Sequence, residues 1–579
     1  MAQWIAAEIV DPVPRHLRER HHPGDERPSA VTEGERAEPR AIRRLVSQVA
    51  DGTPFPDHHP PTGTQQAGLL AGPDGALFNA HAVESSLTLD AFQCGGPFRP
   101  RAYTEYATDD DSRALYLPGT TWTRQRFRVI RRVASVTAQP GSDIATRIVE
   151  ARRSAAPDAF VSITLPAEFD PRVLLDDPQG NGVVASYERP VRGLALVGVG
   201  VAGRVDLPPC AHPAAATDRA RTLLAGAVGG DVPLLAPRLL GGFRFNPTAL
   251  TQEPWGDFGA GWLVLPRLLF VLSGESNAVI VAPGVDASVA ETVVDRVAPS
   301  MATSGALHIE RAMDREAWLN SVAVIASEVR AGKYEKAVLA STQRLASDSP
   351  ISIGRALTRL RVGYPDCHLF TMTEGNTTFL GASPELLVSL FDGRVRALAL
   401  AGSARRGDTP EEDNRIGEIL LASAKDRIEH ETVVRAIRER LGPLTEDLVA
   451  PDQPELRRLR NIQHLSTEIS ARVRSGTGII DLVQRLHPTP AVCGWPADLA
   501  RAVIAEHEAF DRGWYAGPIG WMAAAGDGEF AVGLRSAVVS GNRAWLFAGN
   551  GITGDSVPAS ELAEVQLKFR PLSEALGLF

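Results

Sequence analysis

Lysine is almost absent from this sequence. Only four of its 60 lysine and arginine residues are lysine, and the first 332 residues contain none. The simplest explanation is a genome that encodes arginine for surface cations. Arginine stays protonated at ordinary pH, however, whereas a desolvated lysine can lose its proton. A reaction that needs a neutral amine must therefore keep a lysine, and the candidates are Lys333, Lys336, Lys425 and Lys568.

Cysteine pairs, long apolar runs and an excess of positive charge are also missing. The four cysteines lie far apart and form no CxxC pair, which argues against a disulfide framework or a zinc cluster and favours a reducing cytoplasm. No run approaches the roughly 20 apolar residues of a membrane-spanning helix. The net charge of −9 gives no general attraction to nucleic acid or to anionic membranes. We therefore expect a cytoplasmic protein that binds neither.

The composition divides the 579 residues into three parts. Residues 1–65 are rich in Pro, His, Arg and Glu and lack the apolar spacing of a core, which predicts a disordered extension. Residues 66–157 are more mixed and stay unassigned. From residue 158 to 579, short apolar runs alternate with amphipathic stretches. This alternation predicts one α/β (α+β) region with large sheets.

The last amphipathic stretch carries acids and a lysine on one side. The segment AWLFAGNGITG reads as a strand that enters a glycine-rich turn, and VPASELAEVQLKFRPL reads as the final helix. Helical spacing places Glu561, Glu564 and Lys568 roughly on one face. A surface ion pair explains this spacing equally well. The glycine-rich turn favours a functional site, because its backbone amides can approach a bound anion.

A second group of acids lies in a stretch that we predict as one long helix over residues 411–442. Asp426, Glu429, His430 and Glu431 fall within two of its turns. A solvated helix face is the simpler interpretation. If these acids face the final helix, they could complete a magnesium site, because Mg²⁺ takes one or two protein carboxylates and keeps water and ligand oxygens for the rest.

Two further segments could supply acid–base chemistry. KAVLAST alternates as a strand that begins at Lys336. Ser383-Pro384-Glu385 lies in a predicted turn between two strands, where burial could raise the pKa of a carboxyl and make it a general acid. A turn or capping role is the alternative. His464 has a similar alternative, because a lone histidine is commonly a hydrogen-bonded core residue.

The amino-acid sequence of these segments resembles that of a known family. From about residue 158 to the end, the chain is similar to the chorismate-utilising enzymes, which include isochorismate, salicylate, anthranilate and aminodeoxychorismate synthases. Ten blocks in order carry the resemblance, among them YEKAVLAS, FLGASPELLVS, LLASAKDRIEHETV, LHPTPAVCGWP and LFAGNGI. The resemblance implies the anthranilate synthase component I-like fold, with two large β-sheets, helices outside and the site in a central cleft.

The resemblance also implies roles for the acids and for one lysine. Mg²⁺ would be held by Glu429 and Glu564, with Glu561 close by. Lys336 would be the general base and Glu385 the general acid. The substrate chorismate would lie against Gly402, Ser403, His464, Tyr515, Arg535, Gly549 and Lys568. Among these, Arg535 and Lys568 would bind its carboxylates.

Two positions favour one branch of the family. Isochorismate and salicylate synthases resemble one another in the lysine of K-x-V-L, so Lys336 argues against anthranilate synthase. Ala401 stands where some aminodeoxychorismate synthases carry a covalent lysine, which argues against that branch. The blocks HPTPAVCGWP and YAGPIGW look like isochorismate synthases of the menaquinone kind. We therefore expect an isomerase that makes isochorismate, with no glutamine amidotransferase subunit.

Several alternatives stay open at this point. The chain could be a salicylate synthase, an isochorismate synthase of siderophore supply, or a catalytically silent chorismate-binding or scaffold protein. It also departs from the family pattern at two positions. Ser341 stands where an arginine is common, and Asn550 interrupts a run of small residues in AGNG. Neither change removes a proposed catalytic group.

Overall fold

The computed structural model describes residues 133–136 and 144–578, with gaps at 167–168, 179–181, 226–235, 250, 257, 274–275 and 286–304. The expected extension over residues 1–65 and most of the unassigned region 66–157 lie outside these residues. The described elements begin upstream of residue 158, with strand β1 (Val133–Val136) and helix α1 (Ile144–Ser154). No helix among the described residues is both long and apolar enough to cross a membrane.

Two long neighbouring strands form the trunk of the sheet system. They are β4 (Leu194–Asp206) and β6 (Gly261–Ser273), which pair antiparallel along their length. Both are rich in Val and Leu, as strands buried on both faces are. Beyond β6 lie β7 (Ser276–Val281), β2 (Phe160–Leu165) and β1.

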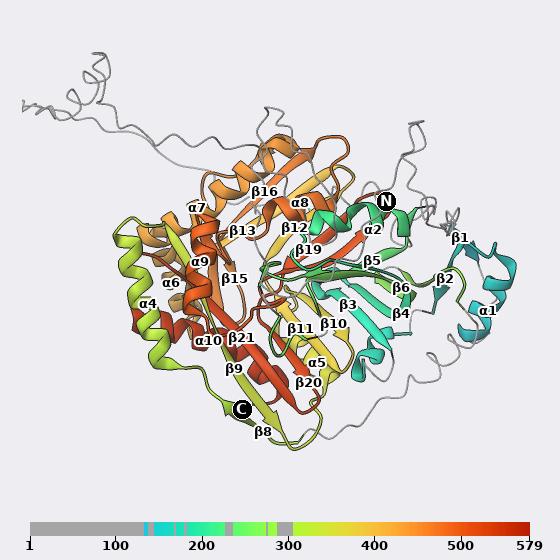
Figure 1. Cartoon of the computed structure of the whole chain (residues 1–579), viewed down its shortest axis with the longest axis horizontal. Helices are drawn as coiled ribbons and strands as arrows, with labels where there is room; N and C mark the ends of the chain where they lie inside the picture. The colour runs from blue at the N-terminus through green and yellow to red at the C-terminus, as the bar shows by residue number, and fades with distance from the viewer. Residues whose placement is uncertain are drawn as a thin grey trace, which may run out of the picture. The chain divides into compact units, whose positions relative to one another are not determined.

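The ladder divides into two branches at this trunk (Figure 1). From β4, one branch runs through β3 (Val183–Arg189), β10 (His368–Glu374), β11 (Thr377–Ser383), β20 (Ser536–Ser540), β21 (Arg543–Ile552) and β9 (Lys336–Ser347). Strand β9 also pairs with β8 (Leu307–Arg311) and β17 (Gly494–Trp495).

From β6, the other branch runs through β5 (Arg238–Phe243), β18 (Pro518–Ala523), β19 (Gly528–Val532), β12 (Leu386–Phe391), β13 (Arg394–Arg405) and β16 (Ile462–Val473). Strand β16 also pairs with β14 (Thr445–Val449) and β15 (Glu455–Arg458). The two expected sheets are therefore the two branches of one ladder.

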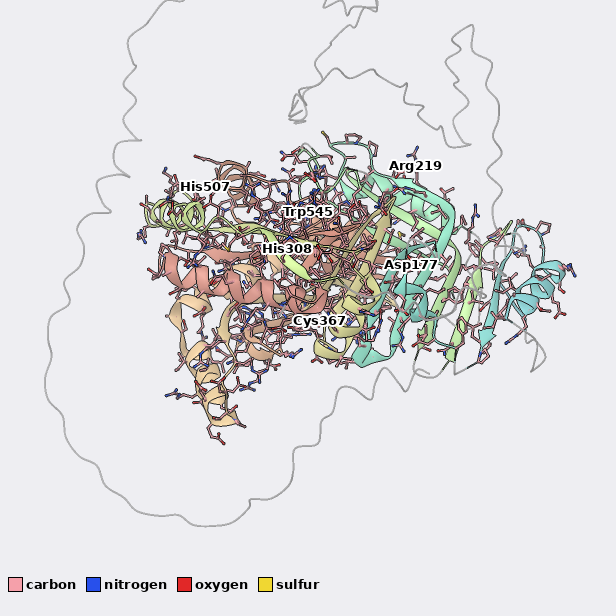
Figure 2. The ribbon with its side chains drawn as sticks, turned by 90° about the horizontal axis from the view of Figure 1, so that it is seen from below. Asp177, Arg219, His308, Cys367, His507 and Trp545 are labelled. Atoms are coloured by element: carbon pink, nitrogen blue, oxygen red, sulfur yellow. The ribbon has the colours of Figure 1, made fainter. Side chains whose placement is uncertain are left out.

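Helices pack on both branches. On the first, α10 (Pro558–Leu576) packs on β21 and touches α4 (Arg315–Arg330) and α5 (Ile353–Gly363). On the second, α7 (Ala424–Leu441) packs on β13 and β16. The other α-helices in the described part of the chain are α2 (Thr217–Leu224), α6 (Pro410–Ala422), α8 (Ile479–Leu486) and α9 (Ala497–His507). Packed side chains fill the body of the fold (Figure 2), and Trp255, Trp262 and Trp514 are fully buried.

Two predicted elements are wrong. The glycine-rich turn expected at AGNG is strand instead, because residues 548–551 belong to β21 and pair with β9. The single helix expected over residues 411–442 is two helices, α6 and α7, separated at Ser423. Ser423 has an extended backbone, and its hydroxyl accepts a hydrogen bond from the Asp426 amide at 3.3 Å. A serine in this position caps a new helix start, because its oxygen satisfies an amide that has no partner within the helix. The break sets the direction of α7, which carries Glu429.

Candidate active site

A pocket of about 300 Å³ lies between the two branches. Strand β21 and Val338 of β9 line it from one branch, and the end of β13 with His464 of β16 lines it from the other. Eleven of the twelve residues expected at the site line this pocket: Glu385, Gly402, Ser403, Glu429, His464, Tyr515, Arg535, Gly549, Glu561, Glu564 and Lys568. Residues far apart in the sequence are thus brought to one place.

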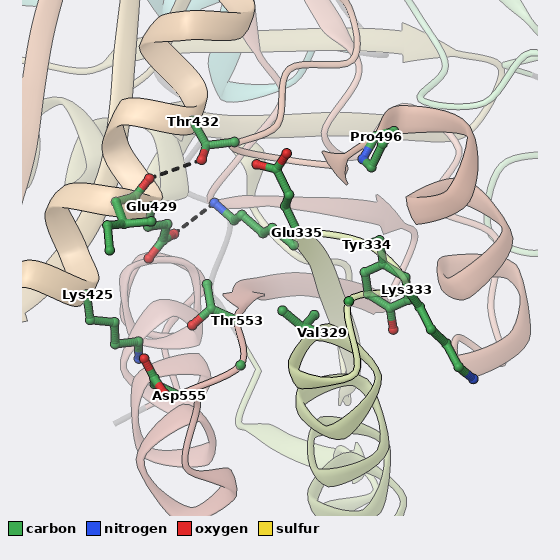
Figure 3. Close-up of a pocket in the computed structure, with 14 residues that line it drawn as sticks. Val329, Lys333, Tyr334, Glu335, Lys425, Glu429, Thr432, Pro496, Thr553 and Asp555 are labelled. Atoms are coloured by element: carbon green, nitrogen blue, oxygen red, sulfur yellow. Dashed lines mark hydrogen bonds and ion pairs between the residues drawn. The ribbon is translucent and has the colours of Figure 1, made fainter. Parts of the chain in front are cut away.

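Lys336 lies just behind this pocket. It lines a neighbouring pocket of about 540 Å³, shown in Figure 3, and its Nζ donates to Glu429 Oε1 at 2.8 Å. Glu429 and Lys425 line both pockets. A Cβ at Gly551 would come within 2.4 Å of Lys336 Cε, so a larger residue there would displace the end of the lysine side chain.

All four lysines of the chain line these two pockets. Three of them pair with the expected metal-site acids. Lys336 contacts Glu429 at 2.8 Å, Lys568 contacts Glu564 at 2.9 Å, and Lys425 lies 3.5 Å from Glu561. The fourth, Lys333, pairs with Glu328 and has an exposed side chain. The scarcity of lysine therefore identified the region of the site.

The acids of α7 and α10 influence one another's pKa. Burial, reinforced by the charge of Glu564, raises the pKa of Glu561. Burial raises the pKa of Asp426 too, and the charge of Glu429 adds to the effect. Burial alone would raise the pKa of Glu429, but the charge and hydrogen bond of Lys336 hold it below its usual value. These acids crowd together in a partly desolvated space.

Such crowding suits a divalent cation. Among the described residues, no three His, Cys, Asp or Glu side chains converge into a ready-made metal cluster. Mg²⁺ does not need one, because it takes one or two carboxylates and completes its shell with water and ligand oxygens. Glu429 and Glu564 come from separate helices to one pocket, and a cation between them would relieve the repulsion among the acids. The residues present therefore fit Mg²⁺.

Glu385 occupies the predicted turn between β11 and β12. Its side chain is buried, and its backbone amide donates to Ser383 Oγ at 3.2 Å. Burial raises the pKa of Glu385 to about 8, against the opposing charges of Lys336 and Lys568. A carboxyl with this pKa is mostly protonated at neutral pH and can donate a proton.

A buried arginine, Arg535, lies beside His464. The Ser403 hydroxyl and His464 Nδ1 are 2.9 Å apart, and His464 Nε2 lies 3.4 Å from an Arg535 nitrogen. Burial and the charge of Arg535 lower the pKa of His464, so the ring is neutral. The Nη1 of Arg535 is buried without a hydrogen-bond partner among the described residues. A ligand carboxylate would satisfy it.

Glycines and aromatic rings shape the rest of the pocket. Gly402 has a φ of 76°, and a Cβ at Gly549 would come within 2.7 Å of the Leu339 carbonyl oxygen, so both positions favour glycine. Tyr515 stacks on Phe547 with ring centroids 5.3 Å apart. Lys568 donates to the Gly549 carbonyl at 3.0 Å, which holds its ammonium group at the pocket wall.

The sequence did not predict a buried ion pair behind the pocket. Glu508 accepts from the Ala340 amide at 2.7 Å, and Arg512 donates to the Val338 carbonyl at 2.7 Å and the Val492 carbonyl at 2.9 Å. The pair thus ties β9 to the loop that follows α8. Lys425 was also not assigned to the site, although the scarcity of lysine had pointed to it.

Comparison with known proteins agrees with this geometry. A family model described as chorismate binding enzyme matches residues 146–577. The salicylate biosynthesis isochorismate synthase of Pseudomonas aeruginosa is 44% identical over 358 residues, which cover 59% of this chain and 75% of that protein. The isochorismate synthase MenF of Bacillus subtilis is 36% identical over 356 residues, with the same coverage of 59% and 75%.

A solved structure confirms the expected fold. The menaquinone-specific isochorismate synthase MenF from Escherichia coli superposes with a TM-score of 0.62 at 28% identity, covering 72% of this chain and 94% of that one. The family resemblance drawn from the ten sequence blocks is also confirmed. The chain belongs to the family of chorismate-binding enzymes.

Proposed function

We propose that this protein is a magnesium-dependent isochorismate synthase, an isomerase that moves the hydroxyl of chorismate from ring carbon 4 to carbon 2. One observation carries the proposal. A single pocket gathers a buried acid that is protonated near neutral pH, a buried arginine with a free donor, and two carboxylates from separate helices. The relatives named as isochorismate synthases support it.

Substrate binding follows from the charges. Chorismate is a dianion, and Arg535 and Lys568 supply two cations at the pocket wall. The unpaired Nη1 of Arg535 would gain a charge-assisted hydrogen bond from a substrate carboxylate. His464 remains a neutral neighbour, so it adds no competing charge. These groups orient the ring between Glu385 and the α7 acids.

Two proton transfers complete the reaction. Water attacks ring carbon 2, and Lys336 takes a proton from it. Glu385 gives a proton to the 4-hydroxyl, which leaves as water while the double bonds shift. Each transfer contributes typically about 10²–10⁴-fold to the rate. Held by Glu429 and Glu564, Mg²⁺ would polarise the conjugated ring system of the substrate. Lys336 acts as the base in its neutral form, because only the neutral amine has a lone pair that can accept the proton.

We assign the enzyme to menaquinone supply, because the blocks HPTPAVCGWP and YAGPIGW look like that branch. One relative is named for salicylate biosynthesis. Salicylate synthesis and siderophore supply are the competing assignments. A catalytically silent scaffold is disfavoured because Lys336, Glu385, Glu429 and Glu564 are all retained. We expect the enzyme to act in the cytoplasm without an amidotransferase subunit.

Product analysis tests the proposal. Purified protein would be incubated with chorismate and Mg²⁺, and the products separated by chromatography. We expect isochorismate as the main product and no turnover after chelation with EDTA. Fluorescent salicylate would identify a salicylate synthase instead. Absence of any conversion by a folded protein with added Mg²⁺ would favour the scaffold.

A further inference from the structure

The three acids of the proposed metal site are held in different ways. Among the described residues, the side chains of Glu429 and Glu564 each have one lysine as their hydrogen-bonding or ion-pair partner. Glu561 is held by neutral groups as well. Asn550 Nδ2 donates to Glu561 Oε2 at 3.1 Å, and Ser556 Oγ donates to Glu561 Oε1 at 2.8 Å. Both oxygens of Glu561 therefore have a fixed donor.

Asn550 reaches Glu561 because of its place in β21. Its neighbours Gly549 and Gly551 line the pocket, and they pair with Ala340 and Val338 of β9. Side chains alternate along a strand, so Asn550 points to the opposite face, where α10 packs. There Asn550 Nδ2 also donates to the main-chain carbonyl of Glu561 at 2.7 Å. One amide thus fixes both the backbone and the carboxylate of Glu561.

The amide oxygen of Asn550 makes no hydrogen bond to the described residues. Asn550 is 1% exposed, and its Oδ1 is buried without a hydrogen-bond partner among the described residues. The amide group cannot be flipped, because the main-chain carbonyl and the Oε2 of Glu561 are both acceptors and require the Nδ2 donor. A buried amide with an unsatisfied oxygen is unfavourable in a strand that could carry a small residue. The hold on Glu561 is the interaction that offsets this disadvantage.

We propose that Asn550 is a positioning residue of the metal site. It keeps the Glu561 carboxylate fixed beside Glu429 and Glu564, which remain free to exchange their lysine partners for a cation. Glu561 then adds negative charge next to the cation at a constant position. This inference rests on the proposed magnesium dependence. Groups that orient a metal site from behind typically contribute about 10–100-fold to metal affinity.

Direct binding of Mn²⁺ to the full-length, substrate-free protein tests this role. Free Mn²⁺ would be measured by electron paramagnetic resonance during titration. We expect Asn550→Ala to raise the Kd for Mn²⁺ by about 10–100-fold. Turnover at saturating Mg²⁺ should return to within about threefold of wild type, because Asn550 takes no part in proton transfer. Asn542→Ala is the matched control, since Asn542 donates to the Ser347 carbonyl at the other end of β21 and should bind Mn²⁺ normally.

A double-mutant cycle separates positioning from general stability. If Asn550 acts through Glu561, Asn550→Ala should have no further effect on Mn²⁺ affinity in a Glu561→Gln background. Should Asn550→Ala fail to fold, Asn550→Ser, which is small and keeps one donor, takes its place. A folded variant with wild-type Mn²⁺ affinity would overturn the inference, and so would additive effects in the cycle. Wild-type protein that binds no Mn²⁺ would instead overturn the proposed metal site.

Discussion

Lys336 Nζ lies 2.8 Å from Glu429 Oε1, and the lysine is only 2% exposed. The contact joins the first residue of β9 to the second turn of α7, and Glu429 lines both pockets. The proposed base and a proposed metal ligand are therefore partners of each other. A cation that takes Glu429 as a ligand would compete with Lys336 for the negative charge of this carboxylate. This relationship makes Lys336 and Glu429 the first residues to test.

Replacing Lys336 by arginine should remove hydroxyl transfer. Arginine carries the same charge and can pair with Glu429, but it cannot accept a proton from water. We expect Lys336→Arg to keep much of the chorismate affinity, measured by calorimetry, while turnover falls by about 10²–10⁴-fold. The packing around Lys336 Cε is tight, so thermal melting should accompany the assay.

Lys333→Arg is the internal control for that experiment. Lys333 has a 61% exposed side chain and pairs with Glu328 at the surface, so its replacement should be nearly silent. If Lys336 serves only as a counter-ion for a substrate carboxylate, Lys336→Arg will keep substantial turnover. An active Lys336→Arg enzyme would end the general-base proposal.

The metal-site acids should be essential for magnesium-dependent turnover. Glu429→Gln or Glu564→Gln keeps the side-chain volume and removes the negative charge. We expect each to lower turnover by at least about 100-fold with little change in melting temperature. Glu431→Gln, an exposed position on the same helix as Glu429, should behave as wild type. Turnover that survives complete chelation with EDTA would contradict the magnesium assignment.

The spacing of residues close in the sequence predicted much of the site. Helical spacing placed Glu561 and Glu564 on one face of α10, and strand alternation placed Lys336 at the start of β9. The turn between β11 and β12 was also predicted, and it carries Glu385. These features depend on residues close in sequence, where period and turn chemistry are strong signals.

Long-range contacts could not be predicted in the same way. The ion pair of Lys336 with Glu429 joins residues 93 positions apart, and the hold of Asn550 on Glu561 depends on how α10 packs on β21. The division of the ladder at β4 and β6 likewise depends on strand register across the fold. The helix break at Ser423 was missed because the apolar spacing continues across it, although a serine cap is readable in the sequence.

Residues 1–65 should be dispensable for the chemistry. The residues that line the two pockets lie between Val329 and Lys568. The composition of the extension offers no apolar pattern that could pack into the cleft. We expect a protein that begins at residue 66 to isomerise chorismate within about twofold of the wild-type rate. A truncated protein that folds by circular dichroism yet loses most of its activity would show the extension to be part of the catalytic unit.

Deprotonation of Glu385 should lower the turnover rate at alkaline pH. The general acid must be protonated, and its pKa is raised to about 8 by burial. Turnover per bound substrate should therefore fall as the pH rises through about 8. Glu385→Gln keeps the shape but cannot donate a proton, so we expect a loss of about 10²–10⁴-fold at every pH. A wild-type rate that stays level from pH 7 to 10 would argue against Glu385 as the acid.

The raised pKa of Glu385 also predicts how the free energy of unfolding depends on pH. The folded-state pKa of Glu385 is about 8 and its ordinary value is 4.5, so between these values the folded state keeps a proton that the unfolded state has lost. The free energy of unfolding should therefore decrease as the pH rises from 4.5 to 8 and level off above 8. Glu385→Gln has no proton to lose, so its stability relative to wild type should increase across this range, by at most about 5 kcal/mol. Urea unfolding of both proteins at pH 5, 7 and 9 measures the difference, and parallel stability curves would show that Glu385 does not keep its proton.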